Sequence, residues 1–411
     1  MSTVRSLLSR TQRVKVSRVL IEAVAASLVA LTLTVSITNA TAAPATATAA
    51  PGAEAAPGAE AARGAEAGSV PPQSDGAPLP PKARAVLVSG LDLHDGTVAK
   101  VGNLYYLYGT RYGCGFAWGV FRTRFCGFGV SAARSLAGPW SRPRLLFSPA
   151  ALDTWGPDKG KTWNNVCGES GSGCFNPRMV KRPDGQWMLW FNAPADHGKY
   201  GANAYYVMGC RGPFGPCGTQ AGPGRGFTVK PKLRTCITNG DFSILTDGGH
   251  AAIVCSQHGI YVEGLDSQWI NGTGRFAGIP ARVSAAELGQ RSPYFVGVGE
   301  GVGAARMPDG SWMMTFSSPG CGYCTGPPLN RSAGGHTQVK TGFAIAPTIF
   351  GPWKVRGNLS TTWCTGQPRT SFSVDGQPYQ LVDRWLGTRN ETDAALLLKP
   401  LPVAPGSWSC S

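Results

Sequence analysis

The sequence predicts an all-β fold, a five-bladed β-propeller, from three observations. Between about residue 86 and the end, the chain shows no convincing helical stripe, and short apolar and aromatic runs are separated by Gly, Pro and Asp. One unit, an apolar run, a tight turn and an aromatic-rich run, recurs five times and is typical of a β-hairpin. The turn glycines Gly185, Gly248, Gly310 and Gly376 are 63, 62 and 66 residues apart, a spacing that suits blades of four strands.

The five hairpin units leave an apolar face that only stacking against a neighbouring unit would bury. They span Thr97–Tyr108, Arg178–Phe191, Phe242–Val254, Ala304–Phe316 and Ser371–Val382. A second mark supports the repeat, because Gly-Pro followed by an aromatic residue occurs late in three units, at Gly138, Gly212 and Gly351. The alternative is a β-sandwich in which the Asp-Gly turns recur by accident.

The first 42 residues have the organisation of a secretory signal peptide. Five basic residues precede an apolar run, Ala23–Ile37, and Ala40-Thr41-Ala42 supplies the small residues of a cleavage site. We therefore expect residues 1–42 to be removed and the protein to be secreted, free of the membrane after cleavage. The alternative is an uncleaved membrane anchor, for which the apolar run is short.

Residues 43–85 form the predicted linker. Gly-Ala-Glu-Ala recurs at Gly52, Gly58 and Gly64, and Pro-rich segments follow. So few apolar side chains cannot offset the entropy lost on ordering, so this stretch is predicted to be a disordered spacer. Residues 86–411 are long enough for one large domain.

All 12 cysteines lie in this domain. An even number behind a signal peptide predicts disulfides in an oxidising compartment. Proximity in the sequence suggests the pairs Cys114–Cys126, Cys167–Cys174, Cys210–Cys217 and Cys236–Cys255. Cys321 and Cys324 could instead form half of a zinc site, but no second pair of ligands completes one, and we expect no bound metal.

The net charge of +15 falls to +11 when the signal peptide, which carries five basic residues and Glu22, is removed. A basic surface attracts anionic polymers. Because the basic residues are scattered, we expect no nucleic-acid partner and favour an acidic polysaccharide or an anionic cell envelope. We expect a monomer.

The candidate catalytic residues are predicted to lie just before the first strand of each unit. The first strands of propeller blades converge on a central channel, so these side chains should meet there. They are His94 with Asp95, Asn176, Asp241, Glu300 and Gln367. Three of them are carboxylates in a body that has only 18 Asp and Glu residues (23 less the five before residue 86). Convergent carboxylates repel one another, so at least one should stay protonated, which provides the acid and the base that glycoside hydrolysis needs.

Several motifs resemble glycoside hydrolase family 43. These are Leu93-His94-Asp95-Gly96, Gly240-Asp241-Phe242, Gly299-Glu300-Gly301 and Asp383-Arg384-Trp385. The resemblance covers nearly all of residues 90–400 and implies a five-bladed propeller. It also implies that Asp95 is the general base, Asp241 the residue that orients and tunes the acid, and Glu300 the general acid.

Within that family, the sequence is most similar to the branch containing exo-β-1,3-galactanases, to which Gln367 and Asp383-Arg384-Trp385 point. It departs from that branch in two places. Those enzymes tend to have Gly at the position of Asp95, and they carry Glu-Arg-Pro-Lys where this chain reads Phe175-Asn176-Pro177-Arg178. The second change removes a carboxylate that faces the sugar, and it leaves galactose, arabinose and xylose open as substrates.

Aromatic side chains supply the stacking faces of a sugar site. Trp118 and Trp163 are the predicted platforms, although a Trp in such a loop can equally be packed. His94 is predicted to bond a sugar hydroxyl or to hold Asp95, with a plain turn histidine as the alternative, and Asn176 and Gln367 complete the predicted substrate contacts. We expect no cofactor, since no set of oxygen ligands for structural calcium is evident.

The resulting prediction is an inverting hydrolase of galactan, arabinan or xylan side chains. Asp95 would activate water on one face of the sugar, and Glu300 would protonate the leaving oxygen on the other. Two rivals are a non-catalytic carbohydrate-binding propeller and a retaining fructan enzyme. The second would carry Asn-Asp-Pro and Arg-Asp-Pro motifs, and neither occurs here.

Overall fold

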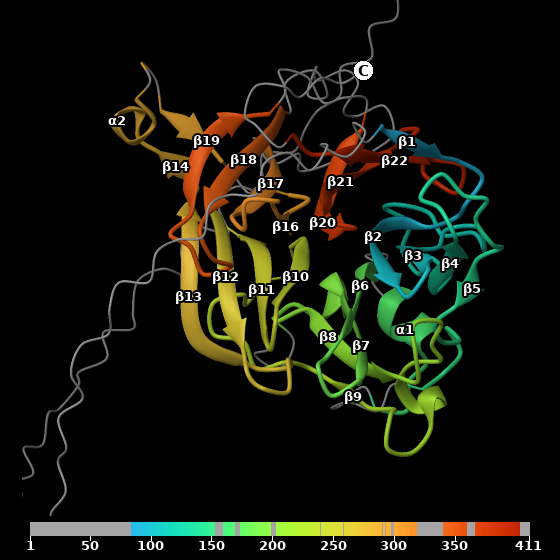
Figure 1. Ribbon diagram of the computed structural model, residues 1–411. Helices are drawn as coiled ribbons and strands as arrows, with labels where there is room; N and C mark the ends of the chain where they lie inside the picture. The colour runs from blue at the N-terminus through green and yellow to red at the C-terminus, as the bar shows by residue number, and fades with distance from the viewer. Residues whose placement is uncertain are drawn as a thin grey trace, which may run out of the picture. The chain divides into compact units, whose positions relative to one another are not determined.

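The computed structural model shows five antiparallel sheets of four strands arranged in a ring (Figure 1). It describes residues 84–152, 159–168, 173–198, 203–238, 240–257, 259–289, 291, 293–296, 300–318, 340–359 and 366–402. The prediction of a five-bladed β-propeller is confirmed, and the β-sandwich is excluded. The predicted signal peptide and all but the last two residues of the predicted linker lie outside the described residues.

Blades one to four are each built from consecutive strands, and the first strand of each blade lies innermost. Contacts between β2 and β6, β6 and β10, β10 and β16, and β16 and β20 join these inner strands around the channel. The strands are β2 (His94–Val101), β3 (Leu104–Thr110), β4 (Phe128–Ala133) and β5 (Arg144–Leu145); β6 (Phe175–Lys181), β7 (Trp187–Asn192), β8 (Tyr205–Cys210) and β9 (Thr228–Val229); β10 (Phe242–Asp247), β11 (His250–Gln257), β12 (Gly259–Leu265) and β13 (Gly272–Pro280); and β16 (Gly303–Arg306), β17 (Trp312–Ser318), β18 (Lys340–Ala346) and β19 (Lys354–Asn358).

The fifth blade combines both ends of the domain. Its first three strands are β20 (Gln367–Val374), β21 (Gln377–Arg384) and β22 (Ala395–Pro400), and its outer strand is β1 (Val86–Val88). β1 pairs antiparallel with β22 and so closes the ring. The remaining elements are a short pair, β14 (Arg282–Val283) with β15 (Tyr294–Phe295), the helices α1 (Trp163–Gly168) and α2 (Ala285–Leu288), and the 3₁₀ turns η1 (Pro194–Asp196) and η3 (Gly218–Ala221).

The apolar core is divided among the interfaces between neighbouring blades. Successive side chains of a strand point to opposite faces of the sheet, so a strand between two blades is apolar on both faces. In β7, Leu189 and Phe191 pack toward the first blade, whereas Met188 and Trp190 pack toward the third. This explains why the aromatic-rich runs of the sequence are continuous rather than alternating.

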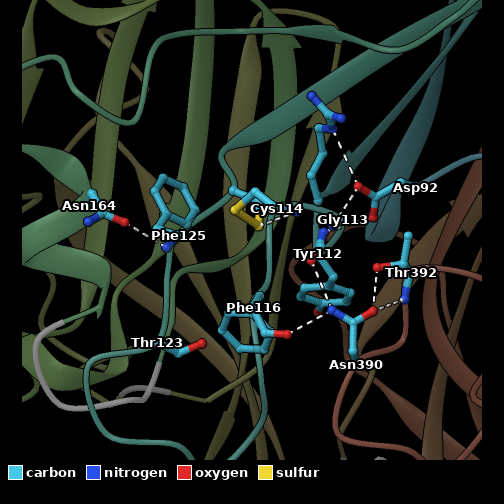
Figure 2. Close-up of a disulfide and its surroundings, with 12 residues drawn as sticks. Asp92, Tyr112, Gly113, Cys114, Phe116, Thr123, Phe125, Asn164, Asn390 and Thr392 are labelled. Atoms are coloured by element: carbon cyan, nitrogen blue, oxygen red, sulfur yellow. Dashed lines mark hydrogen bonds and ion pairs between the residues drawn. A yellow bond between two sulfur atoms is a disulfide. The ribbon is translucent and has the colours of Figure 1, made fainter.

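The four cysteine pairs expected from the sequence are all disulfides in the structure. Cys114–Cys126, in the loop between β3 and β4, is shown in Figure 2, and the others are Cys167–Cys174, Cys210–Cys217 and Cys236–Cys255. Cys321, Cys324, Cys364 and Cys410 lie outside the described residues. In the described part of the chain, every helix is too short or too polar to cross a membrane.

Candidate active site

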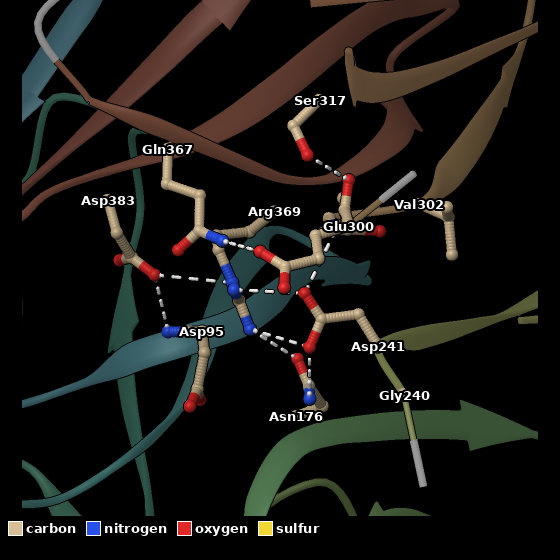
Figure 3. Close-up of polar contacts among 12 residues, drawn as sticks. Asp95, Asn176, Gly240, Asp241, Glu300, Val302, Ser317, Gln367, Arg369 and Asp383 are labelled. Carbon is tan, nitrogen blue, oxygen red and sulfur yellow. Dashed lines mark hydrogen bonds and ion pairs between the residues drawn. The ribbon is translucent and has the colours of Figure 1, made fainter. Parts of the chain in front are cut away.

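The five candidate positions meet at one end of the channel (Figure 3). Asp95, Asn176 and Gln367 lie at the beginnings of the inner strands β2, β6 and β20. Asp241 directly precedes β10, and Glu300 lies three residues before β16. The expected convergence of these residues is therefore what the structure shows.

Three of the inner strands have a β-bulge near the site. The strand pairing shifts between His94 and Thr97, between Phe175 and Arg178, and between Pro368 and Thr370. The bulged segments contain Asp95, Asn176 and Arg369 respectively. A bulge turns a side chain away from the regular alternation of its strand, so these three residues point into the site rather than into a blade interface.

Positive backbone angles mark two of these bulges. Asp95 has φ 48° and Asn176 has φ 58°, a left-handed conformation that Asp and Asn tolerate better than most residues. After Asp95 the chain needs glycine, because a Cβ at Gly96 would lie 1.7 Å from the carbonyl oxygen of Tyr108. The backbone conformation thus accounts for the Asp-Gly sequence at this point.

Glu300 is held at both its main chain and its side chain. Its carbonyl accepts hydrogen bonds from the amide and the hydroxyl of Ser317, at 2.8 and 2.9 Å. Gln367 donates its Nε2 to Oε2 of Glu300 at 3.2 Å. The indole of Trp385 donates to the other end of the Gln367 amide, Oε1, at 2.8 Å, and so fixes which end faces Glu300.

Asp241 is a carboxylate whose negative charge is stabilised by its neighbours. Its oxygens accept from the amide of Gly301 at 2.9 Å and from Nδ2 of Asn176 at 3.0 Å, and Nη1 of Arg369 lies 3.0 Å away. Burial alone would raise the pKa of Asp241, but Arg369 and these hydrogen bonds lower it below its usual value. Burial and the charge of Asp241 raise the pKa of Glu300 to about 8.

Asp95 is more enclosed than the other two carboxylates. Thr110 donates its hydroxyl to Oδ1 at 2.6 Å, and Tyr112 donates its hydroxyl to Oδ2 at 3.2 Å. The backbone amide of Asp95 donates to Oδ2 of Asp383 at 2.8 Å. Burial raises the pKa of Asp95, and it raises the pKa of Asp383 to about 7 despite the nearby Arg369.

Two buried guanidinium groups neutralise this cluster. Arg369 lies between Asp241 and Asp383. Its Nη1 is near Asp241, and its Nε is 3.6 Å from Oδ2 of Asp383. Arg178 donates to the carbonyls of Asp95 and Gly96 at 2.6 and 2.8 Å. It also lines a cavity of about 620 Å³ formed by the opposite ends of the inner strands, so it separates that cavity from the carboxylates. Burial and Arg369 lower the pKa of Arg178 to about 10, which leaves it charged at neutral pH.

The prediction that Trp163 is a sugar platform is wrong. Its side chain is only 1% exposed and belongs to the core between the first two blades. Rings of Phe147, Phe191 and Tyr206 pack edge-on against it, at 5.9, 5.4 and 5.1 Å between centroids. No face of the indole is left for a pyranose.

His94 is likewise enclosed, which corrects its prediction as a sugar contact. It stacks on Tyr112 at 5.1 Å and lies against Trp385 at 5.6 Å. Its Nε2 is 3.6 Å from Oδ1 of Asp92. Burial would lower the pKa of His94, but the neighbouring Asp92 and further carboxylates raise it. His94 therefore supports the wall behind Asp95.

Trp118 remains available as a platform. It is only partly buried, and one face stacks on Phe175 at 4.8 Å. Its edge contacts Tyr112, whose hydroxyl bonds Asp95. The indole is thus part of the same aromatic wall, with the Phe175 side of the ring occupied.

Sequence reasoning assigned no role to Arg369, Arg178 or Asp383. Arg369 and Arg178 each stand two residues after a candidate residue, at the start of an inner strand. A charged residue among otherwise buried strand positions is the signal that could have identified them, because such charges are buried only with partners. Among the described residues, no group of three or more His, Cys, Asp or Glu side chains could hold a metal ion.

The sequence matches no protein-family model and no curated protein, but the structure is similar to solved glycosidases. An exo-β-1,3-galactanase from Phanerochaete chrysosporium, solved with β-1,3-galactotriose, aligns at a TM-score of 0.54 over 79% of this chain and 66% of its own, with 16% identity. An exo-β-1,3-galactanase from Clostridium thermocellum aligns at a TM-score of 0.52 over 77% of this chain and 63% of its own, with 16% identity. A family 43 β-1,3-galactosidase solved with galactodeoxynojirimycin aligns at a TM-score of 0.53 over 77% of this chain and 95% of its own, with 16% identity.

This chain has the propeller fold of those enzymes. The five-bladed propeller that the resemblance to family 43 implied is therefore the fold that the structure has. The chain spans less than two thirds of the length of the first two proteins. At such identities the likeness concerns the fold alone, and the chemistry must be argued from the site.

Proposed function

We propose that this protein is a glycoside hydrolase in which Glu300 is the general acid and Asp241 keeps it protonated. The observation that carries this proposal is the arrangement of the two carboxyl groups: Arg369 lies 3.0 Å from Asp241, and the amide of Gly301, the residue after Glu300, donates to Asp241 at 2.9 Å. Burial and the charge of Asp241 raise the pKa of Glu300 to about 8, whereas Arg369 and hydrogen bonds lower that of Asp241. Two titratable groups pushed apart in this way mark an acid and its ionised partner. At neutral pH, Glu300 holds the proton that a leaving sugar oxygen requires.

The contacts of Glu300 favour delivery of that proton from one atom. Oε2 accepts from Gln367, so the carboxylic proton belongs on Oε1. The bond from Trp385 to Gln367 keeps the amide from rotating. The acid is therefore preorganised, and substrate binding need not reorient it.

Asp95 is the proposed general base of an inverting reaction. Thr110 and Tyr112 each occupy one acceptor site on its two oxygens, and each carboxylate oxygen has a second lone pair with which to accept a proton from water. In this mechanism the two carboxyl groups stand about 6.5–9.5 Å apart, with the water between one of them and the sugar. A structure with bound oligosaccharide would measure that separation.

The proposed substrate is a plant-type polysaccharide with galactan, arabinan or xylan chains. β-1,3-Galactan is the first to test, because the similar structures are of enzymes named for that linkage. The four disulfides support the further proposal that the protein is secreted. We also propose that it acts as a monomer.

The deciding experiment is release of reducing sugar from β-1,3-galactan, arabinan and xylan, with Glu300→Gln as the inactive control. Proton NMR of the first product would give its anomeric form, and inversion is expected. A retained anomer would exclude Asp95 as a base that activates water. No release from any polysaccharide or nitrophenyl glycoside would exclude the hydrolase.

A second candidate, a carbohydrate-binding propeller without activity, is favoured by one specific feature. The segment Phe175-Asn176-Pro177-Arg178 lacks the sugar-facing carboxylate that the resemblance expects in blade two. Phe175 stands where the Glu is expected and stacks on Trp118, and the amide oxygen of Asn176 is already bonded to Arg369 at 2.6 Å. Oligosaccharide binding without release of product, unaltered by Glu300→Gln, would identify this second function.

A further inference from the structure

Asp383 is a carboxylate that the proposed mechanism does not use. It lies near the end of β21, where it pairs with Gln367 of β20 and Leu396 of β22. The whole residue is buried. A buried carboxylate costs stability unless several partners compensate for the lost water. The contacts of Asp383 therefore decide whether it has a structural or a functional reason to be there.

The partners of Asp383 are few. Its Oδ2 accepts one hydrogen bond, from the backbone amide of Asp95 at 2.8 Å (Figure 3). Nε of Arg369 lies 3.6 Å from the same oxygen, which is beyond hydrogen-bond reach. Oδ1 is buried and has no hydrogen-bond partner among the described residues. So sparsely compensated a carboxylate does little for stability, and the amide of Asp95 is the group that it holds.

The main chain of Asp95 is held from two other blades. Its amide donates to Asp383 in blade five, and its carbonyl accepts from Nη1 of Arg178 in blade two at 2.6 Å. These two bonds fix the peptide planes on either side of Asp95, and so the direction in which its side chain leaves the main chain.

That direction is one that the chain does not adopt by itself. Asp95 has φ 48°, and a residue other than glycine keeps a left-handed conformation only where its surroundings hold it. Thr110 and Tyr112 then bond the carboxylate at 2.6 and 3.2 Å. They can do so only because the main chain places the carboxylate between them.

We propose that Asp383 is a positioning residue, which holds the proposed base Asp95 in its left-handed conformation by accepting the amide hydrogen. The inference rests on the proposed role of Asp95. Asp383 is not itself a catalytic residue, because its one hydrogen bond within the described part of the chain goes to the main chain of Asp95. What the site needs from Asp383 is an acceptor oxygen, so asparagine should serve in its place and leucine should not.

The first test compares these two replacements. Asp383→Asn keeps an oxygen that can accept from the amide, whereas Asp383→Leu keeps none. Asp383→Leu should lower kcat about 10- to 100-fold with little change in KM, since a displaced base slows the chemical step rather than binding. Natural and nitrophenyl glycosides should lose equally, and Asp383→Asn should keep most of kcat. Equal losses in the two variants would overturn the proposal.

The second test asks whether Asp383 acts through Asp95. Azide replaces the base in Asp95→Ala, so adding Asp383→Leu to that variant should not change the rate at which glycosyl azide forms. The alkaline limb of kcat/KM should stay in place in Asp383→Leu, because burial, Asp241 and Arg369 set the pKa of Glu300. A further loss with azide, or a displaced limb, would overturn the proposal.

Gln380→Met is the matched control, because Gln380 is another buried polar side chain of β21 and lies outside the site. Its kinetics should be those of the native protein. A loss as large as that of Asp383→Leu would show a general effect of β21 and would overturn the proposal. Thermal unfolding checks that each variant is folded.

Crystal structures of the two Asp383 variants provide a measurement that needs no activity. Asp95 should keep its positive φ in Asp383→Asn and lose it in Asp383→Leu. An unchanged Asp95 in Asp383→Leu would overturn the proposal. Full activity of Asp95→Ala would instead refute the proposed base, so the two failures give different results.

Discussion

Asp241 and Glu300 are neighbouring carboxyl groups whose pKa values are shifted in opposite directions, so that at neutral pH Asp241 is ionised and Glu300 keeps its proton. Arg369 lies 3.0 Å from Asp241 and keeps its pKa low in spite of burial. Burial and the resulting negative charge then raise the pKa of Glu300 to about 8. One cation thus determines which carboxyl group carries the proton.

Replacement of the proposed acid should affect substrates according to their leaving group. Glu300→Gln keeps the shape of the side chain but cannot donate a carboxylic proton, so natural glycosides should lose about 10²–10⁴-fold in kcat. Nitrophenyl glycosides, whose leaving group needs little protonation, should lose less. An equal loss on both would mean that another residue is the acid, and unchanged thermal unfolding would show that the variant is folded.

The pH profile should reveal the coupling of Asp241 and Glu300. An acid works in its protonated form, so kcat/KM should fall as pH rises through about 8. Asp241→Asn removes the charge that raises this pKa, and it leaves Arg369 without its main partner. The alkaline limb should therefore move to lower pH. A limb that stays in place would assign it to a different group.

The proposed base should behave differently from the acid. Asp95→Asn should slow hydrolysis of good and poor leaving groups alike, because water must be activated in either case. Azide should partly restore activity to Asp95→Ala, since this anion needs no base and can enter the vacated space. Rescue is followed by the appearance of glycosyl azide. Full activity of Asp95→Ala without azide would rule out this role.

Replacement of each tryptophan that was expected to bind sugar should have a different effect. Trp118→Ala should raise KM with a modest loss of stability, because Trp118 is only partly buried. Trp163→Ala should reduce the free energy of unfolding by about 3–5 kcal/mol, as expected for an aromatic side chain removed from a core. Denaturant unfolding and Michaelis kinetics distinguish the two, and a large KM change for Trp163→Ala without destabilisation would contradict the structure.

The number of free thiols tests the prediction that all the cysteines are oxidised. Four pairs are disulfides in the structure, and the proposed secretion predicts that Cys321, Cys324, Cys364 and Cys410 are oxidised as well. Titration of the secreted protein with a thiol reagent under denaturing conditions should therefore find almost no free thiol. Two or more thiols would reopen a metal-binding role for Cys321 and Cys324.

The blades could be predicted from the sequence because their signals are local. A hairpin turn such as Asp309-Gly310 and the apolar runs beside it lie within a few residues of each other. Asp95, Asp241 and Glu300 could be placed together for the same reason, since each stands just before or at the start of an inner strand. The position of each residue relative to the hairpin turn of its unit was sufficient to predict that the three would lie together.

Other features depend on contacts between distant parts of the chain. Whether Trp163 faces a sugar or the core is determined by Phe147 and Tyr206, and nothing in its own segment indicates that. Arg369 bonds the amide oxygen of Asn176, 193 residues away. β1 has only three residues and lay at the edge of the predicted linker, so its place in the fifth blade could not be recognised.

The strand that closes the ring has a consequence for how the molecule folds. Val86 pairs with Leu398, 312 residues later in the chain, whereas each inner hairpin joins residues a few positions apart. Closing so long a loop costs entropy that no local contact repays. The first four blades can form from contiguous sequence, but the fifth must wait for both ends. A circular permutant that starts within a loop between two blades would make the fifth blade contiguous, and refolding kinetics would show the gain. In the natural order we therefore expect ring closure to be a late step, which depends on the three residues of β1 at the start of the domain.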